Sequence, residues 1–390
     1  MRDGGMLGLS GIRRCLAFAG FLLLLLFGCG GPPAPSGGQS GEKTLTIGAI
    51  MPLTGAAAQY GQNCKNGIEL AVKENNQANP RLKLKIILED DRTEPKDAVS
   101  AFTKLVAIDK VPLVIGPLPS SCAMAAAPLA NEDKVVLFSP GASTPKLTAA
   151  GPFVFRNWQS DAYEAKIMAR YLVNQGKKQI AILAVNNDFG IALRNFFRQE
   201  FQSLGGRITA TESFQQDATD FRTQLAKIKA SKPEGLYLLS YPKESGNIVN
   251  QATQLGVKVA IYGVAAMEDP SLVKTAGRNA DGIVYTKAVE PASDDPTYRH
   301  FVQAYKAEFG SEPGLIADTG YDAVRMVMQA CESLRVFNGE SLAKALGGIK
   351  NFPGASGLMS FDENGDIIKP VGIKRILKGQ FVWIDRSPSR

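Results

Sequence analysis

Short apolar runs rich in β-branched residues alternate with amphipathic helical patterns from Thr44 onward. This alternation is typical of an α/β fold with parallel sheets, because each parallel strand needs a crossover, usually a helix, before the next strand. The predicted strands form two consecutive series. The first comprises residues 45–50, 82–88, 113–115 and 135–138, and the second comprises residues 179–185, 206–213, 235–239, 259–263 and 283–285. Two series predict two Rossmann-like lobes, each with a doubly wound parallel sheet.

The C-terminal part of the chain constrains how the two lobes are connected. A predicted helix over residues 161–176 opens the second series. Later helical patterns cover residues 296–309 and 317–335, and β-like segments follow at 367–377 and 381–384. A single crossing between the lobes would leave this tail on one side, so we expect a hinge with several crossings. The expected crossings are near residues 155–161, 285–292 and 345–356, which gives lobes of residues 44–158 plus 287–350 and residues 159–286 plus 351–390.

The N-terminal segment has the features of a lipoprotein signal peptide. Two arginines precede an apolar run over residues 18–27, and Cys29 follows a small residue. Because the run is short for a membrane span, we interpret residues 1–28 as a signal peptide, Cys29 as the lipid-carrying residue and residues 29–43 as a flexible tether. The alternative is a retained N-terminal anchor helix. Both interpretations place the protein in the periplasm or at the cell surface, where ATP and nicotinamide cofactors are generally lacking.

Several classes of function are disfavoured by what the sequence lacks. His300 is the only histidine, so we expect no Ser-His-Asp triad and no histidine-based zinc site. The sequence has no GxxxxGK[ST] loop, GxSxG elbow or CxxC pair. The net charge is +7, but the basic residues are scattered, which argues against nucleic-acid binding. The acidic run at residues 362–366 misses EF-hand spacing and is interpreted as a turn. We therefore expect no catalysis, no metal and no cofactor.

Three cysteines remain beyond the signal peptide and the lipidation site. Cys331 follows Val324 and Val327 at helical spacing, which predicts a buried apolar position. Cys64 and Cys122 are each expected in the first turn of a helix that follows a strand. They could form a disulfide in an oxidising compartment if those two strands are neighbours. The sequence leaves the bridged and the free state open, since it does not give the Cα separation.

Ligands of open parallel sheets bind at the carboxyl ends of the strands, where loops lead into helices with unpaired N–H groups. Two such loops, residues 116–121 and 139–145, combine hydroxyl groups with glycine and proline, which suits a carboxylate. Turn and N-cap chemistry is the alternative explanation for both loops. Asp161 is either a helix N-cap, with Glu164 at capping-box spacing, or a partner for a ligand ammonium group. Four aromatic residues that follow strand ends are candidates for the walls of an apolar pocket: Tyr60, Trp158, Phe189 and Tyr241.

The order of short motifs along the chain resembles the type 1 periplasmic substrate-binding proteins, in particular the leucine/isoleucine/valine-binding group of ABC importers. The resemblance extends from about residue 44 to residue 380. The motifs that carry it are Met51-Pro52-Leu53-Thr54-Gly55, Gln59-Tyr60-Gly61, Asn66-Gly67, Asp90-Asp91, Pro95-Lys96, Ile115-Gly116-Pro117, Ser139-Pro140, Phe155-Arg156, Ser160-Asp161 and Asp220-Phe221. It implies a monomer that captures a small solute by hinge closure and delivers it to an ABC permease in the membrane.

The resemblance also implies positions for the ligand site. Ser120 and Ser143, with the backbone around Gly141 and Ala142, would hold the head group of an amino acid, and the aromatic residues and Asp161 would line the cleft. The leucine-binding members place a glutamate for the ammonium group after the strand ending at Gly263, where this chain has Ala265. The resemblance makes an apolar, above all branched-chain, amino acid the main prediction, whereas the missing glutamate leaves other ligands open. Amides, aromatic acids and small carboxylates are alternative ligands, and a sensing or regulatory lipoprotein is the alternative role.

Overall fold

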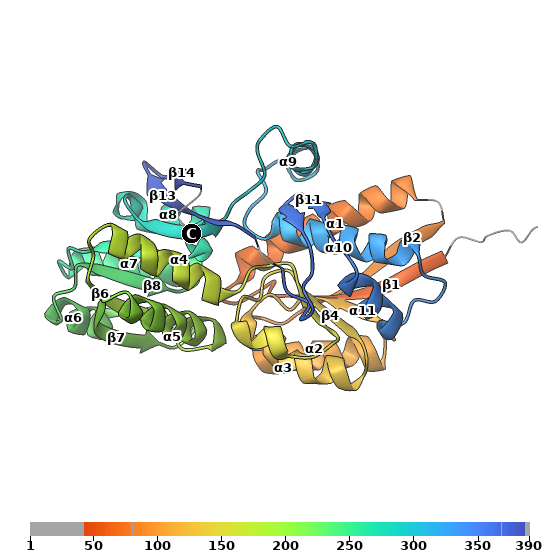
Figure 1. The fold of residues 1–390 in the computed structure, drawn as a ribbon, viewed down its shortest axis with the longest axis horizontal. Coiled ribbons are helices and arrows are strands. Elements are labelled where there is room, and N and C mark those ends of the chain that lie inside the picture. Colours follow the sequence, from red (N-terminus) through yellow and green to blue (C-terminus); the bar gives the residue numbers. More distant parts are fainter. Residues whose placement is uncertain (1–42, 80, 368, 387–390) are drawn as a thin grey trace, which may run out of the picture. The chain divides into compact units, whose positions relative to one another are not determined.

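The computed structural model describes residues 43–79, 81–367 and 369–386 (Figure 1). The predicted signal peptide, Cys29 and nearly all of the tether lie outside the described residues. The described part contains two main sheets, each with helices packed on it, which confirms the predicted α/β fold with two doubly wound sheets. None of its helices is long and apolar enough to span a membrane.

The first sheet has five parallel strands in the order β2-β1-β3-β4-β5. Its strands are β1 (Lys43–Met51), β2 (Leu82–Asp90), β3 (Leu113–Ile115), β4 (Val136–Ser139) and β5 (Val154–Arg156). The first four agree with the predicted strands to within two residues at each end. The sequence analysis missed β5, because three residues after a Gly-Pro pair carry too little pattern to be recognised as a strand.

The second sheet has seven strands in the order β14-β13-β10-β9-β8-β6-β7. Its strands are β6 (Gln179–Val185), β7 (Arg207–Phe214), β8 (Gly235–Leu239), β9 (Ala260–Gly263), β10 (Val284–Ala288), β13 (Val371–Leu377) and β14 (Gln380–Asp385). The strands from β7 to β10 are parallel, whereas β13 and β14 extend the edge in antiparallel fashion. A short ribbon of β11 (Phe352–Gly354) and β12 (Gly357–Met359) is separate from both sheets.

Helices cover the two faces of the first sheet. In Figure 1, α1 and α10 run side by side on one face, while α2 and α3 lie together on the other. The described helices associated with this lobe are α1 (Ala58–Ala78), α2 (Pro95–Ala107), α3 (Ser120–Glu132), η1 (Pro145–Ala149), α9 (Pro296–Phe309), α10 (Ala317–Glu332) and α11 (Gly339–Gly347). Alternating residues of β1 enter the two cores: Ile47, Ala49 and Met51 pack toward α1, and Ile50 packs toward α2 and α3.

The second sheet carries its own helices. They are α4 (Asp161–Asn174), α5 (Asp188–Ser203), α6 (Arg222–Ala230), α7 (Pro242–Gln254), η2 (Ala265–Met267), α8 (Pro270–Ala276) and η3 (Gly277–Ala280). Phe197 and Phe201 of α5 are fully buried and stack on each other, with their ring centroids 5.2 Å apart. Phe196, their neighbour on the same helix, is exposed.

The segment after β12 contacts the first sheet, which indicates where the chain crosses between the lobes. The ring of Phe361 packs against Phe138 and Phe155 of the first sheet, and Asp366 forms a salt bridge with Arg156 of β5. We predicted that the chain returns to the second lobe at residue 351, and this division stays a prediction. The contacts of Phe361 and Asp366 favour a position after Asp366 for the third crossing between the lobes.

Three smaller predictions can be compared with the structure directly. Asp362 accepts hydrogen bonds from the N–H groups of Asn364 and Asp366, so the acidic run forms the predicted turn. His300 is exposed and contacts Glu74. Cys331 is buried, as its helical spacing predicted.

The possible disulfide between Cys64 and Cys122 is not formed, since both thiols are free and buried. Cys64 lies on α1 and faces Gly320 of α10, whereas Cys122 lies on α3, which packs with α2. The strands that precede these helices, β1 and β3, are indeed neighbours. Of the two states that the sequence left open, the structure has the free one, because the two helices cover opposite faces of the sheet.

Candidate functional site

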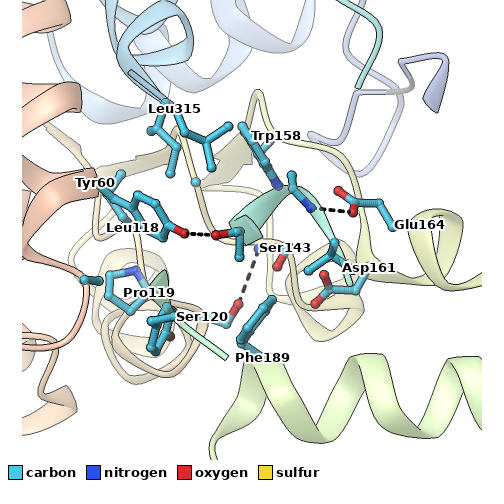
Figure 2. A pocket seen from close by; sticks show the side chains of 17 residues that line it. Tyr60, Leu118, Pro119, Ser120, Ser143, Trp158, Asp161, Glu164, Phe189 and Leu315 are labelled. Carbon is cyan, nitrogen blue, oxygen red and sulfur yellow. Dashed lines mark hydrogen bonds between the residues drawn. The ribbon is translucent and has the colours of Figure 1, made fainter. Parts of the chain in front are cut away.

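A pocket is lined by loops and helix starts that follow strands of both main sheets (Figure 2). Its empty space is about 540 Å³ when the part open to solvent is included, and the part that admits the centres of water molecules is about 50 Å³. The pocket therefore suits a compact small molecule rather than a polymer. Its walls are formed by Ala57, Tyr60, Leu118, Pro119, Ser120, Gly141, Ser143, Trp158, Asp161, Glu164, Phe189, Tyr241, Val264, Ala265, Ala266, Leu315 and Ile316.

Sheet topology explains why these residues meet. The carboxyl ends of parallel strands lie at one edge of a sheet, so the segments that follow them converge there. Ser120 follows β3, Ser143 follows β4 and Asp161 follows β5 in the first sheet, while Phe189 and Tyr241 follow β6 and β8 in the second. Segments far apart in the sequence are thus brought to one place.

The start of the β3 loop is shaped by Gly116. Its φ of +99° lies in a region that side chains rarely adopt, and a Cβ atom there would be 2.0 Å from the carbonyl oxygen of Ile50. Only glycine fits this close approach of β1 and the loop. The loop then leads through Leu118 and Pro119 into α3, whose N-terminus lies at the pocket.

The N-terminus of α3 provides donors suited to a carboxylate. The first N–H groups of a helix have no partner within it, and they carry a partial positive charge. The Oγ atom of Ser120 accepts hydrogen bonds from the N–H groups of Ser143 (3.3 Å) and Thr144 (3.2 Å), which ties the β4 loop to α3. The hydroxyl proton of Ser120 remains available to a ligand, because these two bonds use only its acceptor capacity.

Asp161 contributes a carboxylate to the same pocket. It is 2% exposed, and its Oδ2 atom has no hydrogen-bond partner. Burial raises the pKa of Asp161 well above its ordinary value, the nearby charge of Glu164 raises it further, and a hydrogen bond with Ser143 and the charge of Arg156 oppose the increase. An unpaired buried carboxylate is costly in free energy, so this atom calls for a donor or a cation.

Glu164 is the pocket residue whose position the sequence analysis misjudged. The sequence left two roles for Asp161, an N-cap with Glu164 at capping-box spacing or a ligand contact. In the structure α4 begins at Asp161 itself and its N-cap is Ser160, without a side-chain cap, so the N-cap alternative is wrong. Both carboxylates lie inside the first turn of the helix and line the pocket. Among the described residues that line it, none is Lys, Arg or His.

Aromatic and aliphatic side chains form the apolar walls. The rings of Phe189 and Tyr241 stack with their centroids 5.5 Å apart, and Tyr60 meets Tyr241 edge to face at 6.5 Å. Leu118 and Leu315 complete the wall near Tyr60 in Figure 2. Such side chains bury the apolar part of a ligand while the polar groups fix its orientation.

Hydrogen bonds close the pocket between the two sheets' loops. The hydroxyl of Tyr60 donates to the carbonyl oxygen of Ala266 (2.9 Å), and the N–H of Asp188 donates to Ser121 Oγ (3.0 Å). The ammonium group of Lys146 pairs with the Asp188 carboxylate at 2.8 Å. These contacts join loops that follow strands of the two sheets.

Most of the predicted site residues come together in this one pocket: Tyr60, Ser120, Gly141, Ser143, Trp158, Asp161, Phe189, Tyr241 and Ala265. Ala142 is the exception. Its side chain packs in the core beneath α2 and α3, and its N–H donates to Ser139 Oγ at 3.0 Å. Ala142 therefore does not line the pocket, contrary to our prediction. Sequence reasoning missed Leu315 and Ile316, which precede α10, because no strand precedes them to mark their position.

Glu268 cannot substitute for a carboxylate at Ala265. It lies outside the pocket walls and pairs with Lys287 (2.6 Å) and Lys374 (2.7 Å), and it accepts a hydrogen bond from the hydroxyl of Tyr285. Burial alone would raise its pKa, but the charges of the two lysines lower it overall. Glu268 is thus an ionised member of a separate network.

The buried carboxylate of Asp91 predicts a pH effect on stability. Burial raises the pKa of Asp91 from 3.8 to about 7, and its Oδ2 atom has no partner. Between about pH 4 and pH 7, the folded protein holds a proton that the unfolded chain has released, so stability falls as the pH rises. We expect Asp91→Asn to increase the free energy of unfolding at pH 8 by on the order of 2 kcal/mol and to have little effect at pH 4.

Urea denaturation at both pH values measures this difference, and Asp90→Asn is the matched control. Burial alone would raise the pKa of Asp90, but hydrogen bonds from Arg92, Thr54 and Leu53 lower it overall. The stability contribution of Asp90 is therefore present at pH 8 and lost as the pH falls through its folded pKa, so this control should destabilise the protein at pH 8. Equal destabilisation by Asp91→Asn at both pH values would contradict the prediction.

Comparisons with known proteins were made with the whole sequence and fold. Residues 44–380 match the family model described as periplasmic binding protein. Leu/Ile/Val-binding protein homolog 3 of Brucella melitensis is 29% identical over 331 residues, which cover 84% of this chain and 89% of that protein.

Among three similar solved structures, two contain ligands, and these ligands belong to different classes. The leucine-binding protein LivK of Thermotoga maritima has 30% identity and a TM-score of 0.83, covering 88% of this chain and 99% of that one. LivJ of Streptococcus pneumoniae in complex with isoleucine has 28% identity and a TM-score of 0.81, covering 88% and 100%. A Rhodopseudomonas palustris solute-binding protein in complex with 3,4-dihydroxybenzoic acid has 28% identity and a TM-score of 0.80, covering 89% and 97%.

Proposed function

Because the chain belongs to the periplasmic binding protein family, a family of extracytoplasmic solute-binding proteins, we propose that it captures an apolar amino acid and delivers it to an ABC permease. Lipid attachment at Cys29 would hold the protein at the membrane, and one chain would bind one ligand. Binding and hinge closure are sufficient for this role, so no covalent step is proposed.

The observation that supports the proposal is a pocket that combines a helix N-terminus, an unpartnered carboxylate oxygen and apolar walls. The N-terminus of α3 with Ser120 would receive the ligand carboxylate. The unpartnered Oδ2 atom of Asp161 would receive the ligand ammonium group. Tyr60, Phe189 and Tyr241 would cover the ligand side chain. A free amino acid with an apolar side chain has this combination of groups.

The relatives support this ligand class. The names of the Brucella relative and of the two Liv proteins refer to leucine, isoleucine or valine, and one of these structures contains isoleucine. An aromatic acid is the second candidate, since a similar protein binds 3,4-dihydroxybenzoic acid. The aromatic walls suit such a ring, but a benzoate has no ammonium group to pair with Asp161. A sensory role with the same ligand remains compatible with the pocket.

A thermal-shift screen over amino acids, amino acid amides and aromatic acids tests the proposal. A ligand present at about 100 times its dissociation constant adds about 2.7 kcal/mol to the free energy of unfolding, which corresponds to roughly 4 °C in Tm for a chain of this size. We expect branched-chain amino acids to give the largest shifts, and the ligand to be recovered chemically unchanged. Larger shifts with aromatic acids would indicate that the ligand belongs to that class. Chemical conversion of the ligand would indicate that the protein is an enzyme.

A further inference from the structure

Glu164 is a buried, well-held carboxylate at the wall of the pocket. It is 2% exposed and lines the pocket together with Asp161, three residues before it on α4. Its Oε1 atom accepts a hydrogen bond from Gln159 Nε2 (2.6 Å). Its Oε2 atom accepts hydrogen bonds from Thr286 Oγ1 (2.7 Å) and, more weakly, from the N–H of Ala265 (3.4 Å).

Three separate elements hold this side chain in place. Gln159 precedes α4, Thr286 belongs to β10 and Ala265 opens η2. Burial raises the pKa of Glu164, while the hydrogen bonds from Thr286, Gln159 and Ala265 oppose the increase. Donated hydrogen bonds stabilise the ionised form, so these contacts both orient the carboxylate and favour its negative charge.

The pocket contains no cation that compensates this charge. The nearest candidate on the preceding strand is Arg156, which is engaged by both oxygens of Asp366 at 2.6 Å. The hydroxyl of Tyr237, which lies outside the pocket walls, is buried without a hydrogen-bond partner; burial raises its pKa, and the charges of Glu164 and Asp161 raise it further. Two carboxylates thus line one part of the pocket, and the described residues that line it include no basic side chain.

We propose that Glu164 is a specificity-determining residue that, with Asp161, forms a two-carboxylate site for a primary ammonium group. The inference rests on the proposed function, which assigns an apolar side chain to the ligand. It adds that the pocket selects ligands with an amine and rejects acids of the same shape without one. Figure 2 shows both carboxylates on the same side of the pocket, across from Tyr60 and Leu118.

Calorimetric titration with three probes of one shape tests this site. The probes are leucine, 4-methylpentanoate, which lacks the amine, and 3-methylbutylamine, which lacks the carboxylate. For the unmodified protein, we expect leucine to bind at least 100-fold more tightly than 4-methylpentanoate. Glu164→Gln should weaken leucine and 3-methylbutylamine at least 10-fold and leave 4-methylpentanoate unchanged or improved. Thr286→Val, which removes one donor to Glu164, should shift the same ratio in the same direction by a smaller factor.

The matched control is Glu268→Gln, because Glu268 is a buried carboxylate on a neighbouring segment outside the pocket. It should leave the ratio of leucine to 4-methylpentanoate affinity unchanged. If Glu164→Gln weakens all three probes equally, or leaves leucine binding unchanged, Glu164 is only structural and the inference is wrong. If the protein does not bind leucine but binds 3-methylbutylamine in a manner dependent on Glu164, the ammonium site stands and the proposed amino acid ligand fails.

Discussion

Replacing Arg156 by methionine is expected to lower the free energy of unfolding by about 3–5 kcal/mol, because it leaves the Asp366 carboxylate without its partner. Arg156 is 1% exposed. Its Nε and Nη2 atoms donate to the two carboxylate oxygens of Asp366 at 2.6 Å. Its Nη1 atom donates to the carbonyl oxygen of Thr144 at 2.8 Å, next to the pocket residue Ser143. Ligand affinity should therefore decrease together with stability.

Urea denaturation at pH 7 measures the loss, with Lys134→Met as the matched control. Lys134 pairs with Glu340 at 2.7 Å, but both side chains are exposed, so this variant should change stability by less than about 1 kcal/mol. Adding Asp366→Asn to Arg156→Met should recover part of the stability, since it removes the uncompensated charge. An Arg156 variant as stable as the Lys134 control would show that the buried pair does not hold β5 and the turn at residues 362–366 together.

Replacing Asp161 by asparagine is expected to weaken amino acid binding by about 100-fold or more, the loss of a buried charge-assisted contact of about 3 kcal/mol. The same variant should not destabilise the ligand-free protein. The folded-state pKa of Asp161 is raised, so above that pKa its ionised carboxylate lowers stability and a neutral amide removes the penalty. Loss of binding without loss of stability separates a ligand contact from a structural residue.

Calorimetry for affinity and urea denaturation for stability measure the two effects. Asp220→Asn is the control, because Asp220 is an exposed carboxylate on the second lobe that lies outside the pocket walls. This control should bind amino acids as the unmodified protein does. If Asp161→Asn binds within threefold of the unmodified protein, the ammonium position assigned to Asp161 is wrong.

The sequence was sufficient to predict most of the strands and many of the pocket walls, because both follow from local pattern. Alternating apolar runs placed the strands, and the rule that parallel strands present their carboxyl ends at one edge placed Tyr60, Ser120, Ser143, Phe189 and Tyr241. To place these residues, we needed only the order of the strands along the chain and not which strands are neighbours in the sheet. Pocket-lining residues that come directly after a strand can thus be predicted from the sequence.

The parts that were missed depend on contacts between distant segments or on a shift of one residue. Arg156 and Asp366 are 210 residues apart, and nothing in either local pattern marks them as partners. The start of α4 at Asp161 rather than one residue later moved Glu164 from a predicted capping role into the pocket. Cys64 and Cys122 lie after neighbouring strands but on opposite faces, a choice that the crossover helices decide and the sequence does not show.

A crystal structure of the protein with the ligand that gives the largest thermal shift tests the central claim most directly. We predict one ligand molecule in the pocket, with its carboxylate at the N-terminus of α3 and Ser120, and its ammonium group within hydrogen-bond distance of Asp161. A ligand bound elsewhere on the protein, or one in the pocket with its carboxylate toward Asp161 and Glu164, would contradict the account.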